Sequence, residues 1–224
     1  MLSTRDAVIE LRSGTFVLLI IILVAISVLV ASGITAEFDE PIIRAIVDAR
    51  GIPSVDALML VITSLTDLFI IVPFSLILLI KRKTRRLGAI LLMALVLSTL
   101  ASTYLKQIVD RERPQYEFQP SIDLGYKPEQ DVISRSASSF PSGHATRSAA
   151  FALIISYMIR DRFLAGIPAG IMMWAFPASV AFSRIYIGAH YPTDVIAGVV
   201  LGIIIANGLG RILKFEATVQ QSQT

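Results

Sequence analysis

The stretch FVLLIIILVAISVLV, residues 16–30, contains one polar side chain and lies in a segment without charge between Arg12 and Glu37. An α-helix of about 20 apolar residues is about 30 Å long, which matches the hydrocarbon core of a bilayer. We therefore expect a membrane-spanning helix over about 14–33. A cleavable signal peptide is the alternative, but its apolar region is usually shorter, at about 7–15 residues, and its leader is basic.

Long uncharged stretches of this kind recur along the chain. Of its 224 residues, 54% are hydrophobic and 17% are charged, whereas soluble domains carry about 25% charged residues. The absence of cysteine excludes a disulfide framework, a thiolate nucleophile and a thiolate-ligated zinc site. The gaps between charges predict six spans, at about 14–33, 57–80, 87–106, 143–159, 163–183 and 193–211. The expected fold is all-α, a six-transmembrane helical bundle in a single domain over 1–214, with a polar tail over 215–224.

Basic residues are concentrated in the loops expected on one face. The turn at 81–86 carries five lysines or arginines and no acid, and further basic residues follow the fourth and sixth spans. This distribution explains the formal net charge of +3 without a nucleic-acid partner. By the positive-inside rule, this face and both termini are expected to be cytoplasmic in a multi-pass protein of the cell membrane. The pattern indicates no oligomeric state.

The opposite face carries the longer polar segments. An amphipathic helix is expected around 39–50, and we expect it to rest in the headgroup layer. The longest non-apolar stretch, 106–142, also falls on this outer face. A long loop in a compact bundle is usually functional or disordered.

Three polar motifs from separate parts of the chain fall on this outer face. They are Lys106-Gln-Ile-Val-Asp-Arg-Glu-Arg113-Pro114, Pro141-Ser142-Gly143-His144 and Ser183-Arg184-Ile-Tyr-Ile-Gly-Ala-His190-Tyr-Pro-Thr-Asp194. Together they contain both histidines of the chain. Because the topology returns each motif to the same side at similar depth, we expect them to form one site.

The residue types of this site indicate phosphate chemistry. Lys106, Arg113 and Arg184 supply three cations, and the planar guanidinium fork matches the oxygens of a phosphate. Ser142 and Gly143 precede a predicted helix, whose first backbone N–H groups can bind an anion. Taken singly, a cation at the end of a span is more often an interfacial anchor, and Ser-Gly is more often only a cap. The joint pattern favours a phosphate cradle.

The histidines suit the reaction itself. Asp194 follows His190 by four residues, a spacing that lets the carboxylate hydrogen-bond one imidazole nitrogen. The other nitrogen can then attack phosphorus, with His144 as the general acid for the leaving group. A metal site is disfavoured, because two histidines and one carboxylate are few ligands and the nearby cations would repel a metal ion.

The three motifs resemble the signature of the type 2 phosphatidic acid phosphatase superfamily, Lys-x6-Arg-Pro, Pro-Ser-Gly-His and Ser-Arg-x5-His-x3-Asp, which occurs here unbroken and in order. The resemblance implies an integral-membrane lipid phosphatase that needs no metal or cofactor and forms a phosphohistidine. It implies His190 as the nucleophile, Asp194 as its partner and His144 as the acid and base. It also implies a phosphate cradle of Lys106, Arg113, Ser142, Gly143 and Arg184.

Some polar residues lie outside the signature. Asp67 interrupts the second apolar stretch, where an acid is costly, so we expect it either to face a cavity or water or to form a polar collar at the membrane edge. Arg147 follows one turn after the second motif and could touch substrate phosphate or pair with Asp67. Asp110, Arg111 and Glu112 are expected to form a solvated loop face.

The expected function is hydrolysis of the terminal phosphate of a membrane lipid at the extracytoplasmic rim. A polyprenyl diphosphate such as undecaprenyl diphosphate is favoured because the chain is compact with short loops, and phosphatidylglycerophosphate and phosphatidic acid are the alternatives. Vanadium-dependent haloperoxidases resemble these phosphatases at the same motifs but are soluble and larger. A non-catalytic phospholipid-binding or transport protein is the alternative of another class, and the presence of both histidines argues against it.

Overall fold

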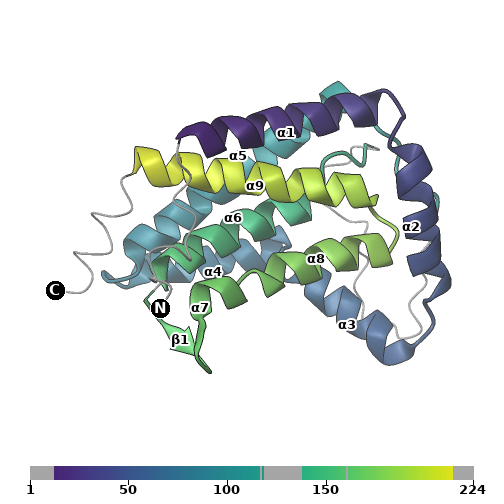
Figure 1. Ribbon diagram of the computed structural model, residues 1–224. Helices are drawn as coiled ribbons and strands as arrows, with labels where there is room; N and C mark the ends of the chain where they lie inside the picture. The colour runs from purple at the N-terminus through teal and green to yellow at the C-terminus, as the bar shows by residue number, and fades with distance from the viewer. Residues whose placement is uncertain (1–12, 117, 119–137, 160, 214–224) are drawn as a thin grey trace.

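The computed structural model describes residues 13–116, 118, 138–159 and 161–213 (Figure 1), so the predicted tail at 215–224 lies outside the described residues. The helices are α1 (Ser13–Ala31), α2 (Ala36–Asp48), α3 (Pro53–Ser64), α4 (Leu68–Ile80), α5 (Arg85–Val109), α6 (Gly143–Met158), α7 (Ala169–Met172), α8 (Ala175–Tyr186) and α9 (Pro192–Ile212). Two short strands, β1 (Phe163–Leu164) and β2 (Ile167–Pro168), pair antiparallel. The predicted helical fold class is confirmed apart from this small hairpin.

Helices α6 and α9 form the centre of the bundle because small residues let their backbones approach closely. Of the 16 residues of α6, 12 are buried. On α9, Gly198 and Gly202 face this helix: an added Cβ would lie 3.0 Å from the Cβ of Ala145 and 2.9 Å from that of Ala149, respectively. Such small-residue faces are typical of helix pairs in membranes. The pairing brings together the starts of both helices, where the second and third motifs lie.

Helix α2 runs across one end of the bundle, past the ends of α1 and α9 (Figure 1). Its inner face contains Asp39 and Ile43, which are both completely buried. Ile43 packs in a cluster with Ala145, Ile185 and Val195 from three other helices. The expectation that this helix only rests in the headgroup layer is therefore wrong: one face of α2 is part of the protein interior.

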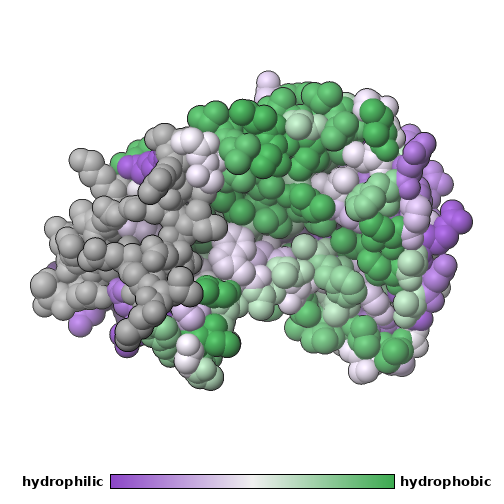
Figure 2. All heavy atoms as spheres, in the orientation of Figure 1, coloured by the Kyte–Doolittle hydropathy of each residue, from purple (hydrophilic) through white to green (hydrophobic). Residues whose placement is uncertain are grey.

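Several helices are long and apolar enough to cross a membrane. Within the described residues these are α1, α5 and α9, and α3 with α4 forms a fourth candidate that is bent by 49°. Only 6% of the residues of α1 over Gly14–Ala31 are buried, and Figure 2 shows hydrophobic residues over this face and hydrophilic residues gathered at the α2 end. Exposed apolar surface on this scale supports a membrane location.

Two predicted spans are not single helices. The segment 57–80 is divided into α3 and α4, because Asp67 takes an extended conformation before α4. The segment 163–183 contains the β1–β2 hairpin, α7 and most of α8, because Ala165 and Gly166 turn the chain with φ values of 51° and 79°. Helix α6 has 16 residues, fewer than the roughly 20 that span a bilayer core. The count of six spans therefore stays a prediction.

The predicted basic face corresponds to the end of the bundle opposite α2. The Arg86 guanidinium on α5 donates a hydrogen bond to the carbonyl oxygen of Leu213 after α9, at 3.0 Å. This contact joins the basic turn before α5 to the basic end of α9. The side of the membrane that this end occupies stays a prediction.

Candidate active site

The three sequence motifs meet at the end of the bundle that α2 covers. The Lys106 ammonium, near the end of α5, donates to the carbonyl oxygen of Ser138 at 2.6 Å, four residues before Ser142. The backbone N–H of Ser142 donates to the carbonyl oxygen of Asp194 at 3.0 Å. These bonds connect the first motif to the segment that leads into the second, and the second to the third. The structure thus brings together the motifs that the sequence predicts to form one site.

The turn after α5 depends on a residue in the left-handed region. Asp110 ends the helix with φ 44° and ψ 47°, and its N–H donates to the carbonyl oxygen of Lys106. Aspartate is one of the few side chains that tolerate this conformation. The turn sends the following residues back toward α9, so that Arg111 and Arg113 are half-buried while Asp110 and Glu112 are exposed.

The predicted phosphate cradle is strongly positive, and apart from the half-buried Arg113 its residues are buried. Arg184 is completely buried and Lys106 is 4% exposed. The Arg184 guanidinium donates to the hydroxyl of Thr63 at 3.0 Å. Ser142 caps α6, with its hydroxyl oxygen facing the N–H of Ala145. Several cationic donors directed to one place match the oxygens of a phosphate group, so this arrangement suits a phosphate.

His190 lies inside this positive region and next to Asp194. The ring is 2% exposed, and its Nδ1 is 3.8 Å from Oδ2 of Asp194. That distance is too long for a hydrogen bond, so the predicted pair is adjacent but not bonded. Burial, and then the charges of Arg184, Lys106 and Arg113, hold the pKa of His190 well below its usual value. The ring is therefore neutral at pH 7, as a nitrogen nucleophile must be.

We expect the lowered pKa of His190 to set the acidic limit of activity. A depressed pKa means that the neutral ring persists as the pH falls through 6.5 and is protonated only at lower pH. Activity that depends on neutral His190 is therefore retained at pH 6 and lost in more acidic solution. The measurement is kcat/KM between pH 4.5 and 8 on a soluble phosphomonoester, corrected for the substrate's own ionisation. If kcat/KM fell to half of its maximum at or above pH 6.5 on the acidic side, the assignment of that limit to His190 would be contradicted.

The end of α3 and the break before α4 supply three groups to the same region. The carboxylate of Asp67 lies 2.8 Å from Nε2 of His144. The backbone carbonyl of Thr66 accepts a hydrogen bond from Nε of Arg147 at 3.0 Å, and Thr63 accepts from Arg184. Asp67 therefore faces the interior of the site, one of the two positions that the sequence analysis left open.

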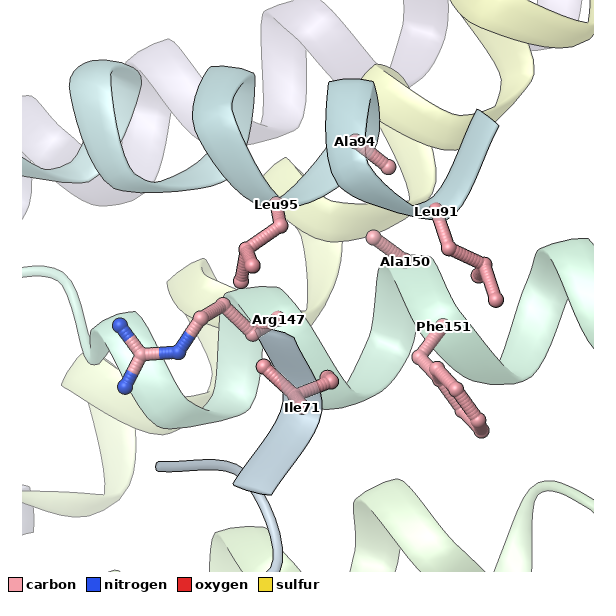
Figure 3. Close-up of a pocket in the computed structure, with 7 residues that line it drawn as sticks. All are labelled: Ile71, Leu91, Ala94, Leu95, Arg147, Ala150 and Phe151. Carbon is pink, nitrogen blue, oxygen red and sulfur yellow. The ribbon is translucent and has the colours of Figure 1, made fainter. Parts of the chain in front are cut away.

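Arg147 lies where the polar site meets an apolar wall. Figure 3 shows its guanidinium directed away from the apolar side chains of α4, α5 and α6 that line a small pocket together with Arg147. Those side chains belong to Ile71, Leu91, Ala94, Leu95, Ala150 and Phe151. The structure thus places Arg147 one turn below His144 at the edge of the cradle. A direct contact with substrate phosphate stays a prediction.

The importance of Arg111 was not apparent from the sequence. Its guanidinium forms ion pairs with Asp39, at 2.7 Å, and with Asp194, at 2.8 Å. The prediction of a solvated position is therefore wrong for Arg111, although it holds for its exposed neighbours Asp110 and Glu112. The spacing of the two arginines could have indicated this position. Residues two apart in an extended segment share a face, so Arg111 shares a face with Arg113 of the first motif.

Comparison with known proteins agrees with the motifs. The family model described as the PAP2 superfamily matches residues 87–216, more than half of the chain. This chain belongs to the PAP2 superfamily. The match covers all three motifs, and the α2, α3 and α4 residues that complete the site lie before it.

The relatives of this PAP2 protein include several bacterial and archaeal phosphatases. It is 30% identical over 128 residues to a lipid A 4'-phosphatase of Porphyromonas gingivalis, covering 57% of this chain and 51% of that protein. It is 27% identical over 159 residues to an undecaprenyl-diphosphatase of Sulfolobus acidocaldarius, covering 70% of each. The chain thus spans about half the length of the lipid A 4'-phosphatases that it matches.

The fold of the PAP2 protein also matches a solved structure. The crystal structure of a transmembrane PAP2 type phosphatidylglycerolphosphate phosphatase from Bacillus subtilis aligns with a TM-score of 0.71 at 24% identity. The alignment covers 89% of this chain and 96% of the Bacillus protein. The likeness shows that the two proteins share a fold.

Proposed function

We propose that this PAP2-superfamily protein is an integral-membrane lipid phosphatase that removes a terminal phosphate through a phosphohistidine on His190. The observation that carries the proposal is the position of His190, buried among three cations with the carboxylate of Asp194 beside it. A buried histidine surrounded by cations is unfavourable for stability and suits the attack of a neutral nucleophile on a bound anion.

Lys106, Arg113 and Arg184 bind the phosphoryl oxygens of the substrate, together with the backbone at Ser142 and Gly143. These donors are held in place before substrate binds: Lys106 by the Ser138 carbonyl and Arg184 by the Thr63 hydroxyl. Preorganised donors stabilise the charge of the equatorial oxygens in the transition state and cost little rearrangement.

In the first chemical step, the His190 nitrogen that does not face Asp194 attacks phosphorus, and the bond from phosphorus to the leaving oxygen breaks. The leaving oxygen takes a proton from His144. Asp67, 2.8 Å from the ring, orients His144 and stabilises its protonated form. In the second step, His144 accepts a proton from water, whose oxygen attacks the phosphohistidine. Inorganic phosphate leaves and His190 is restored.

The favoured substrate is a polyprenyl diphosphate, with phosphatidylglycerophosphate and phosphatidic acid as alternatives. A relative named as an undecaprenyl-diphosphatase matches 70% of this chain, which supports the first choice. The site faces the outside and both termini are cytoplasmic, because the basic turn before α5 lies at the other end of the bundle.

The test is phosphate release by protein purified in detergent, with and without EDTA. The substrates are undecaprenyl diphosphate, phosphatidylglycerophosphate, phosphatidic acid and a soluble phosphomonoester. We expect EDTA-resistant release that is absent in His190→Ala, with undecaprenyl diphosphate the best substrate. Loss of release in EDTA would overturn the metal-free mechanism. Folded protein that releases no phosphate from any lipid would instead indicate a non-catalytic phospholipid-binding or transport protein.

A further inference from the structure

Two completely buried carboxylates on different helices share one arginine. Asp39 lies on α2 and Asp194 lies in the first turn of α9. Between them, Arg111 pairs through one terminal nitrogen with Oδ2 of Asp39 and through the other with Oδ1 of Asp194. Two carboxylates buried this close together require a cation, so the three side chains act as a unit.

Arg111 is held by further contacts of its side chain and its backbone. Its guanidinium stacks over the ring of Tyr191 at 3.9 Å and also donates to the Thr193 hydroxyl at 2.8 Å. Its backbone carbonyl accepts a hydrogen bond from the N–H of Ser139 at 2.7 Å. A side chain fixed in this way has little freedom left, so it can fix the orientation of the groups that it binds.

Asp39 adds a second connection between α2 and the start of α9. One of its oxygens accepts from the backbone N–H of Thr193 at 3.0 Å, and the other accepts from the Thr193 hydroxyl. The first N–H groups of a helix have no partner within the helix. The α2 carboxylate satisfies one of them, and its charge is favourable at this end of α9.

The contacts of Asp194 determine which oxygen faces the histidine. Oδ1 accepts from Arg111, while Oδ2 accepts from the backbone N–H of Tyr191 at 2.9 Å and is the oxygen 3.8 Å from Nδ1 of His190. With Oδ1 engaged, the carboxylate cannot rotate away from the ring without breaking an ion pair.

From this geometry we propose that Arg111 is a positioning residue that holds Asp194 toward His190, and that Asp39 makes α2 part of the active site by holding Arg111. The inference rests on the proposed function, because it acts through the His190–Asp194 pair. It concerns the rate of the chemical step, since none of the contacts of Arg111 described above is to a cradle residue that would bind the substrate.

The experiment measures kcat and KM on the best lipid substrate for Arg111→Met, Arg111→Lys and Asp39→Asn. The matched control is Glu112→Gln, which removes the exposed charge next to Arg111 in the chain. We expect Arg111→Met to lower kcat by about 10- to 100-fold with KM within about threefold, as misplacement of a catalytic group does. Arg111→Lys should recover part of the loss, Asp39→Asn should lower kcat less, and Glu112→Gln should leave both constants unchanged.

A second comparison separates positioning from a structural role. In an Asp194→Asn background, Arg111→Met should cause no further fall in kcat, because the residue through which it acts is already altered. The inference would be overturned if the kcat losses of Arg111→Met and Asp194→Asn multiplied in the double variant. A rise in KM at constant kcat, or full activity in the Arg111 and Asp39 variants, would overturn it as well. Asparagine has nearly the same shape as aspartate, so Asp39→Asn still tests the inference if Arg111→Met does not fold. Wild-type protein without activity would refute the proposed function itself, and the inference with it.

Discussion

Replacing His190 with alanine is expected to lower kcat by about 10,000-fold or more on every substrate, lipid or soluble. No other residue of the site can take over as the nucleophile, since His144 already serves the leaving group. The change removes a ring that is 2% exposed, so the measurement includes thermal unfolding to show that the variant is folded. A phosphohistidine trapped by acid quenching from wild type should be absent from the variant.

His144→Ala is the informative partner of this variant. An acid that protonates the leaving oxygen contributes about 100- to 10,000-fold on an alkyl phosphate. The acidic phenol of an aryl phosphate leaves without that proton. In the first turnover, before His144 is needed as the base for water, His144→Ala should therefore be slowed much less on an aryl phosphate than on an alkyl phosphate, whereas His190→Ala should lose all activity on both. Equal slowing of the first turnover of His144→Ala on both substrates would contradict the assignment of the two histidines.

Replacing Gly202 with leucine is expected to prevent the close packing of α6 and α9. An added Cβ would lie 2.9 Å from the Cβ of Ala149, 3.0 Å from the backbone nitrogen of Ala150 and still nearer the carbonyl oxygen of Thr146. Backbone atoms of a helix cannot move aside cheaply, and overpacking costs about 3 kcal/mol or more in such a case. Activity should be lost as well, because this pairing holds Ser142 against Asp194.

The same helix offers a matched control. Among the described residues, no atom outside the neighbouring backbone of α9 lies within 4 Å of an added Cβ at Gly208, and a helix interior generally favours other residues over glycine by about 0.5–1 kcal/mol. Gly208→Leu should therefore leave the unfolding temperature in detergent unchanged or slightly raised, while Gly202→Leu should yield little monodisperse protein. Equal behaviour of the two variants would show that close α6–α9 contact is not what stabilises the bundle.

The residues of the candidate site were predictable where chemistry and spacing coincide. His190, Arg184 and Asp194 occur in one short motif, and the structure brings them together with Lys106 as expected. The role of α2 was not predictable: its pattern is that of any amphipathic helix. In the sequence, Asp39 is one more acid in an acidic segment. Only the tertiary structure shows that it is buried and paired with Arg111.

The divided helices show the same distinction. Hydropathy finds apolar stretches such as 57–80 and 163–183 but is insensitive to a break within them, because the residues on both sides stay apolar. In the first stretch, a single acid at position 67 marks the break between α3 and α4. In the second, the turn at Ala165 and Gly166 does so.

The sequence by itself indicated a membrane location and predicted that its polar residues form a phosphate site, because both follow from residue types and their order. Only the tertiary structure decided which charged residues are paired. The ion pairs of Arg111 join residues 72 and 83 positions away, and the contact between His144 and Asp67 spans 77. Such pairs depend on how the helices cross, and no local pattern in a single sequence records that.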